Sequence, residues 1–257
     1  MVDMSIFQAL VDMEENNQAG ALCTIIRSKG STPRHVTSKM LVYPDGHIIG
    51  TVGGGEVENR VIREAIEALG DKKPRLLSYN MANPERGDPG VCGGQLEIYV
   101  EPILPKPVLV VIGVGHVGKA VAHLAKWLGF TVAVSDDRQD FCNPQSVPEA
   151  DEFYPLPLEE LSRQITITPW TYIVLTTRGM DVDVKGLPPL LESDAAYIGV
   201  IGSKRRWATT KKKLIETGVA KQRLDEVHSP IGIEIYAETP EEIAVSIMAE
   251  IIKLHQH

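Results

Sequence analysis

A glycine-rich turn, Gly113–Gly118, has the spacing G-x-G-x-x-G and is the stretch best suited to hold a phosphorylated ligand. In such turns the first glycine permits a tight turn, the second lets the backbone approach a pyrophosphate, and the third lets helix and strand pack closely. Asp136 ends the next apolar run, where a carboxylate accepts from ribose hydroxyls, and Arg138 leaves NADP open as the ligand. The turn's predicted contacts are Gly113, Gly115, His116 and Gly118, joined by Asp136 and Arg138.

A second candidate centre is Cys92, which is followed by Gly93 and Gly94 in a polar stretch. A thiolate is a soft ligand for a thiophilic metal, and flanking glycines let a bulky ligand come close. The alternative is a small inert side chain, the usual role of a lone cysteine and the one we assign to Cys23 and Cys142. We therefore predict Cys92 as a metal ligand and Gly93 and Gly94 as cofactor contacts, with the inert role left open.

Two further glycine-containing turns precede helical patterns. At Gly53, Gly54 and Gly55, unpaired backbone N–H groups would hold a phosphate or the polar edge of a pterin, or the glycines serve only a tight turn. Gly202 and Ser203 precede the cations of 204–206, which stand where a helix dipole disfavours positive charge. A bound anion, for which Gly202 and Ser203 are the predicted contacts, would account for those cations, and so would an acidic partner surface or simple solvation.

The patterns G-x-S-x-G, H-E-x-x-H and G-x-x-x-x-G-K-[ST] are absent from the sequence, and no two residues stand out as nucleophile and base. His228 lines a cleft or makes a structural hydrogen bond, and the second role is the commoner. We therefore predict no catalytic residue, which favours a binding protein over a hydrolase.

The elements that must position these residues form two modules. After residue 103, apolar runs alternate with helical patterns and predict a Rossmann-like parallel sheet. Its strands are predicted at 108–112, 130–134, 172–176 and 197–201, and its helices at 117–128, 182–191, 204–217 and from Pro240 onward. Thr239 and Glu242 make a capping box for the last helix, and 137–170 is predicted to be rich in loops.

Before this lies a smaller α+β module. Its helices are predicted at 5–15 and 56–69, and its strands at 21–26, 39–43, 47–49, 75–79 and 95–100. Residues 101–108 hold three prolines and are predicted to form a linker. The predicted fold class is α/β, with domains at 1–102 and 103–257.

Composition excludes several classes of protein. The 257 residues carry a net charge of −8, which argues against nucleic acid as a partner. No apolar run is long enough for a membrane helix, and the first residues show no signal-peptide pattern. Three widely spaced cysteines suit a reduced compartment, so we expect a cytoplasmic protein.

Ordered segments along nearly the whole chain resemble the XdhC/CoxI family of xanthine dehydrogenase accessory proteins. The matching segments are 30–34, 39–42, 53–58, 92–102, 113–118, 136–141, 197–203, 227–232 and 239–247. The resemblance implies a chaperone that binds molybdenum cofactor (molybdopterin), assists its sulfuration and inserts it into a molybdenum hydroxylase. It also implies two protein partners, the hydroxylase and a cysteine desulfurase. We further expect a homodimer, because a small module on a proline linker exposes an apolar face.

Two alternatives rest on the glycine turn with Asp136. The first is an NAD(P)-dependent oxidoreductase, for which the sequence offers no convincing catalytic residue near the nicotinamide. The second is an adaptor that is regulated by a nucleotide and handles no molybdenum.

Overall fold

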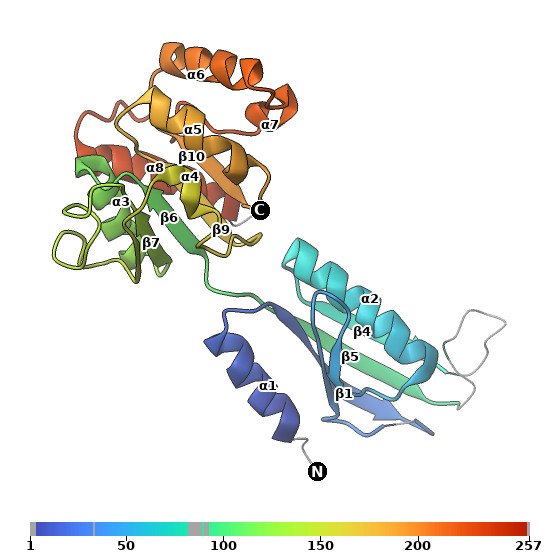
Figure 1. Cartoon of the computed structure of the whole chain (residues 1–257). Coiled ribbons are helices and arrows are strands. Elements are labelled where there is room, and N and C mark those ends of the chain that lie inside the picture. Colours follow the sequence, from blue (N-terminus) through green and yellow to red (C-terminus); the bar gives the residue numbers. More distant parts are fainter. Residues whose placement is uncertain (1–3, 33, 82–88, 90–92, 256–257) are drawn as a thin grey trace. The chain divides into compact units, whose positions relative to one another are not determined.

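The computed structural model describes residues 4–32, 34–81, 89 and 93–255. The chain separates into two compact units, residues 1–105 and 106–257 (Figure 1). None of the helices in the described ranges is long and apolar enough to cross a membrane.

The first unit is an antiparallel sheet of five strands in the order β3-β2-β1-β5-β4. The strands are β1 (Gly20–Lys29), β2 (Lys39–Val42), β3 (Ile48–Gly50), β4 (Arg75–Asn80) and β5 (Gln95–Ile103). The helices are α1 (Met4–Glu15) and α2 (Gly55–Asp71).

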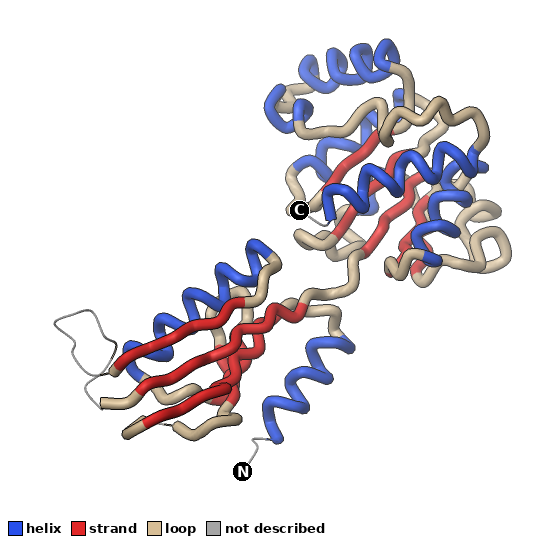
Figure 2. Tube along the Cα trace, turned by 180° about the vertical axis from the view of Figure 1, so that it is seen from behind, coloured by secondary structure: helices blue, strands red, loops and turns tan. Residues whose placement is uncertain are grey.

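Alternate side chains of this sheet enter two different cores, as the pleat of a strand requires. On β2, Met40 and Val42 pack in the cluster that α2 covers, whereas Leu41 packs with Ala9 and Met13 of α1. The two helices therefore cover opposite faces of the sheet, which Figure 2 shows from behind.

The proline-rich linker is shorter than the sequence predicts. Strand β5 continues through Pro102 to Ile103, and Pro102 lies opposite Ala21 of β1. Pairing of β5 with β4 ends at Val100, so beyond that residue β5 has an open edge on the β4 side. Proline is tolerated at such an edge because no neighbouring strand needs its N–H as a donor.

The second unit is a parallel sheet in the order β10-β9-β6-β7-β8, the Rossmann order counted from β6. Its strands are β6 (Val108–Ile112), β7 (Thr131–Ser135), β8 (Glu152–Tyr154), β9 (Thr171–Leu175) and β10 (Tyr197–Val200). Its helices are α3 (His116–Trp127), α4 (Leu158–Leu161), α5 (Met180–Leu191), α6 (Lys204–Glu216), α7 (Lys221–Asp225) and α8 (Pro240–His255). The α/β fold with a Rossmann-like second part is as the sequence predicts.

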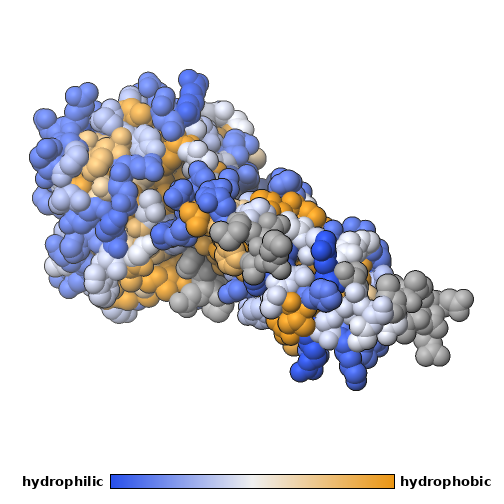
Figure 3. All heavy atoms as spheres, turned by 90° about the horizontal axis from the view of Figure 1, so that it is seen from below, coloured by the Kyte–Doolittle hydropathy of each residue, from blue (hydrophilic) through white to orange (hydrophobic). Residues whose placement is uncertain are grey.

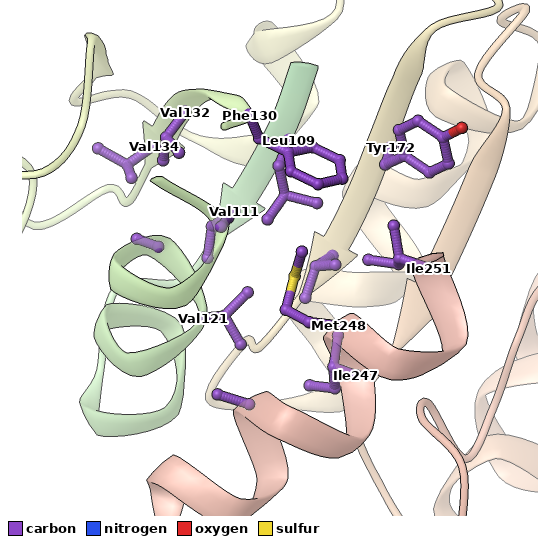
Figure 4. Close-up of a cluster of buried hydrophobic side chains, with 14 of the residues drawn as sticks. Leu109, Val111, Val121, Phe130, Val132, Val134, Tyr172, Ile247, Met248 and Ile251 are labelled. Atoms are coloured by element: carbon purple, nitrogen blue, oxygen red, sulfur yellow. The ribbon is translucent and has the colours of Figure 1, made fainter. Parts of the chain in front are cut away.

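Both faces of this parallel sheet are buried, which explains its nearly continuous apolar strands. Leu109 and Val111 pack against α3 and α8, whereas Val110 and Ile112 pack on the other face against α4 and α5. Figure 4 shows the first cluster, with Met248 of α8 directed at the strands.

Three short elements are missing from the sequence-based prediction. They are β8, α4 and α7, and each spans no more than five residues. Periodicity cannot identify such short elements, because one turn of helix or three strand residues gives no repeat to detect.

Candidate functional site

The glycine turn lies at the carboxyl edge of the parallel sheet, between the ends of β6 and β9. At this point the strand order reverses, which is where ligands bind in open sheets of this kind. A cavity of about 300 Å³ opens there. Its lining includes the predicted Gly113, Asp136 and Arg138, together with Ser135, Thr177 and Arg178. We call it the carboxyl-edge cavity.

The three glycines of the turn have different steric surroundings. Gly113 has a φ of 92°, and a Cβ there would stand 2.8 Å from the Thr176 carbonyl oxygen. A Cβ on Gly118 would overlap the Gly113 carbonyl, so this glycine lets the helix start close to the turn. A Cβ on Gly115 would meet nothing within 4 Å, so the turn leaves free space beside its backbone. The geometry fits a ligand that approaches the backbone at Gly115.

The carboxylate of Asp136 is bound within its own chain. Oδ2 accepts from the Val114 N–H at 3.0 Å and from Arg138 Nη2 at 2.8 Å. Oδ1 accepts from the Arg138 N–H at 3.1 Å and from its Nε at 2.8 Å. The side chain of Asp136 is only 3% exposed, and the Arg138 guanidinium lies 3.8 Å from the centre of the Phe141 ring. Asp136 thus ties β7 to the glycine turn, and a ribose would have to displace Arg138 to reach it.

Burial and hydrogen bonding act on Asp136 in opposite directions. Burial raises the pKa, but the hydrogen bonds from Arg138 and Val114 outweigh it, and the pKa lies below its ordinary value. The same pairing raises the pKa of Arg138. Both groups are therefore charged at neutral pH.

One hydroxyl on the lining of the carboxyl-edge cavity lacks a partner. Ser135 Oγ is fully buried and makes no hydrogen bond within the described residues. Strand alternation directs Ser135 to the face of Ala133, the face covered by α4 and α5. A buried hydroxyl without a hydrogen-bond partner is rare in folded proteins. A ligand in the cavity would provide the missing partner.

A second cavity of about 480 Å³ lies where α5 and α6 begin. Its lining includes the predicted Ser203 together with Arg178, Arg205 and Arg206. Ser203 caps α6 by accepting from the Arg206 N–H at 3.2 Å, and a Cβ on Gly202 would meet the Arg206 side chain. We call this the arginine cavity.

His116 does not join either of these cavities. It is exposed at the start of α3 and lines a separate cavity of about 540 Å³ with residues of α8. The exposed imidazole is thus a side chain on the surface of α3.

The triple-glycine loop of the first unit already holds an anion, the chain's own Glu58. Glu58 Oε2 accepts from Thr51 Oγ1 at 2.5 Å and from the N–H groups of Val52 and Gly54 at 3.2 Å each. Gly53, Gly54 and Gly55 all have positive φ, at 137°, 75° and 64°. The tight-turn requirement is thus real, and an external anion would compete with Glu58 for the same amides.

Gly93 and Gly94 form a close backbone contact in the first unit. Gly93 donates to the Met81 carbonyl at 2.6 Å, and Met81 donates to the Gly94 carbonyl at 2.9 Å. A Cβ on Gly94 would overlap the Ser31 carbonyl. Cys92 itself lies outside the described residues, so its role as metal ligand stays a prediction.

The other two cysteines are structural. Cys23 and Cys142 are buried, and burial raises both thiol pKa values, to about 12 for Cys23. Within the ranges that the structure describes, no group of three or more metal-binding side chains is present.

Sequence reasoning missed the residues that follow β9. Thr177 and Arg178 line the carboxyl-edge cavity, and Arg178 lines the arginine cavity as well. Ligands of open parallel sheets bind at the carboxyl ends of the strands, which is why Gly113 and Asp136 were predicted. Thr177 and Arg178 also follow the carboxyl end of a central strand, so the same rule applies to them. Ser135 carried no such signal, since only the fold shows its hydroxyl to be unpartnered.

Comparisons with known proteins find relatives that match nearly the whole chain. It is 38% identical to the uncharacterized protein YqeB of Escherichia coli over 98% of this chain but only 46% of that protein. It is 26% identical to a protein of Bacillus subtilis that is named as a probable xanthine dehydrogenase subunit, over 97% of this chain and 98% of that protein. It is 23% identical to the molybdenum cofactor insertion chaperone PaoD of Escherichia coli, over 98% and 89% respectively.

The chain thus spans about half the length of the first of these relatives. A solved structure titled as a xanthine dehydrogenase from Bacillus halodurans covers all of this chain at a TM-score of 0.53 and 23% identity, over 96% of its own length. At that identity the likeness shows the fold alone.

Two family models match, one in each unit. The model described as the XdhC and CoxI family matches residues 13–80, and the XdhC Rossmann domain matches 109–251. The second match alone covers more than half of the 257 residues. The chain therefore belongs to the XdhC and CoxI family.

Proposed function

We propose that the chain binds molybdenum cofactor, assists its sulfuration and inserts it into a xanthine dehydrogenase-type molybdenum hydroxylase. The observation that carries the proposal is the match to the insertion chaperone PaoD along 98% of this chain. The Bacillus subtilis relative, with xanthine dehydrogenase in its name, supports the same class of client. The lack of a nucleophile and base pattern agrees with a carrier that turns over no substrate.

The carboxyl-edge cavity has groups that fit such a cargo. Molybdopterin carries a pterin with hydrogen-bonding edges and a terminal phosphate. Ser135 Oγ is an unused polar group for a ring edge on the lining of this cavity. Gly115, which has free space beside its backbone, lies outside that lining. Gly113, Gly118 and Asp136 shape the turn through their contacts with backbone atoms and Arg138, and Gly113 and Asp136 also line the cavity.

The remaining parts of the proposal concern partners and assembly. A carrier must hand its cargo on, so the hydroxylase and a cysteine desulfurase are the proposed partners. A homodimer is proposed because the first unit exposes apolar side chains, among them Ile26, Leu76 and Tyr99. Figure 3 shows hydrophobic patches among the hydrophilic side chains of one surface. A monomer mass by light scattering at micromolar concentration would contradict the dimer.

Cofactor loading tests the proposal directly. The full chain is purified anaerobically from cells that make molybdenum cofactor, and molybdenum and pterin are assayed per protomer. We expect loading near one per protomer, and a loss of about fivefold or more in Ser135→Ala, because the substitution removes the buried hydroxyl. Ser193→Ala is the matched control, since Ser193 Oγ donates to the Leu190 carbonyl at the end of α5.

Cys92→Ser probes the thiolate separately. We propose that its sulfur contacts the metal, so this variant should keep the pterin and lose molybdenum or sulfur. Protein that stays free of pterin when cofactor is added would overturn the carrier function.

Nucleotide binding is the second candidate function, as an NAD(P)-dependent oxidoreductase or a nucleotide-regulated adaptor. The Rossmann strand order and the glycine turn favour it. The hydrogen bonds from Arg138 to Asp136 argue against nucleotide binding. They occupy the carboxylate that would otherwise accept from the ribose hydroxyls. Titration with NAD, NADH and NADPH at millimolar concentration, with no binding observed, would remove this candidate.

A further inference from the structure

Three guanidinium groups line the arginine cavity. They belong to Arg178, Arg205 and Arg206, and the other lining residues are Gly179, Met180, Ser203 and Thr209. None of these seven residues carries a carboxylate. A concentration of one sign of charge around a cavity attracts ligands of the opposite sign.

The partners of the three arginines differ. Arg206 Nη2 is 2.7 Å from Oδ2 of the fully buried Asp183, so this cation is neutralised within the fold. Arg178 Nη2 is 2.6 Å from Asp137 Oδ2, and both side chains are about half exposed, so the pair is weak in water. Arg205 is exposed and makes no ion pair with any residue the structure describes.

The backbone adds to the positive potential. Both α5 and α6 begin at this cavity, and Gly179 and Ser203 are their first flanking residues. A cation in the first turn of a helix is unfavourable, and α6 has Lys204, Arg205 and Arg206 there without any acidic residue. Asp183 neutralises the charge of Arg206, and a bound anion would offset the charges that remain in this first turn.

Phosphate is the anion that this lining fits. Guanidinium groups bind phosphate through parallel N–H bonds, and the hydroxyl of Ser203 remains free to donate while its oxygen caps the helix. A dinucleotide bound across this edge would place its nicotinamide ring near β9 and β10. That ring carries no anionic group for the three guanidinium groups to bind.

We propose that the arginine cavity binds the phosphate monoester of the cargo, with Arg178 and Arg205 as the binding cations. The inference rests on the proposed function for the identity of the cargo. Arg178 lines both cavities, so the two are neighbours at this side chain, and the proposal places the ring in the carboxyl-edge cavity and the phosphate in the arginine cavity. Arg206 holds α6 against α5 through Asp183 and positions the site.

Titration of the full chain with inorganic phosphate tests the subsite without any cofactor. We expect saturable binding followed by calorimetry or by amide shifts at 203–206. Arg205→Gln and Arg178→Gln should each weaken it about fivefold or more, since each removes a charge-assisted bond. Lys212→Gln is the control, because Lys212 lies on the same helix, pairs with Glu216 and lines no part of the cavity, and should change affinity less than about twofold. Unchanged phosphate binding in Arg205→Gln would overturn the subsite.

A second arm separates the subsite from the proposed function. The wild type and Arg205→Gln are titrated with molybdopterin and with its dephosphorylated form. We expect the wild type to prefer the phosphorylated form about tenfold, and the variant to lose that preference. Equal wild-type affinity for both forms would overturn the subsite and leave the carrier function standing. Binding of neither form, with Arg205-dependent binding of phosphate, would overturn the carrier function and keep an anion site for another phosphate ester.

Discussion

Asp136 accepts four hydrogen bonds from its own chain, three of them from Arg138 and one from the glycine turn. A carboxylate with this number of donors has little capacity left for a ligand. The residue therefore serves the shape of the turn, and specificity must come from other side chains at the same edge. Ser135 has an unused hydroxyl at this edge, and Arg178 is held by a half-exposed pair with Asp137 that is weak in water.

Removing Arg138 should destabilise the second unit. In Arg138→Ala the buried carboxylate keeps the backbone N–H groups of Val114 and of position 138 but loses both guanidinium bonds, and we expect a loss of about 1–3 kcal/mol in the free energy of unfolding. Urea denaturation at pH 7 measures it. Arg163→Ala, an exposed arginine, is the control and should change stability by less than about 0.5 kcal/mol.

The same variant should change the acid dependence. The lowered pKa of Asp136 contributes stability above its unfolded pKa, and the contribution is lost as pH falls through the folded pKa. Without Arg138 the folded pKa rises, so less of this stability exists at any pH. An Arg138→Ala protein that matches the wild type in both stability and acid dependence would contradict this account.

At the scale of elements, Glu250 of α8 joins β10 to the segment that follows α7. Its carboxylate accepts from Tyr197 Oη at 2.6 Å and from the Gly232 N–H at 2.8 Å, and it lies 3.1 Å from His228 Nδ1. His228 also bonds the backbone of β10, through Ile198 and Val200. The histidine thus has the structural role that the sequence left open.

Glu250→Gln should weaken this junction. Burial raises the pKa of Glu250, but bonds from Tyr197, Gly232 and His228 outweigh it, so the folded pKa is below the ordinary value. The charged form therefore stabilises the fold above the unfolded pKa, and this stability is lost as pH falls through the folded pKa. We expect a loss of about 1–3 kcal/mol at pH 7 that shrinks toward pH 3. Chemical denaturation over that range measures it, with the exposed Glu241→Gln as a control that should show no such trend.

Long periodic elements could be predicted from the sequence, and the contacts between them could not. The glycine turn was identified because its strand, turn and helix are contiguous in the chain. Arg178 and Arg205 line one cavity because α5 and α6 both begin there, although the two residues are far apart in the sequence. The order of residues alone also does not reveal that the carboxylate of Glu58 bonds the N–H groups of Val52 and Gly54 in the glycine loop.

At the scale of the whole molecule, the described residues of the two units form separate cores, and residues 104–107 join β5 to β6. We propose that each is an independent folding domain. Residues 106–257 alone should unfold in one cooperative transition, with a urea midpoint close to one of the transitions of the full chain. A fragment that lacks cooperative unfolding would contradict this division.

The shared position of Arg178 has a consequence for affinity. A ligand that draws Arg178 into one cavity removes it from the other and from Asp137, so occupancy of the two cavities is coupled. Thermodynamic linkage makes the coupling reciprocal. The factor by which free phosphate changes the affinity for a ring equals the factor by which the ring changes the affinity for phosphate. A compound that carries both groups at the right separation gains avidity that offsets this antagonism, whereas its two separate halves compete.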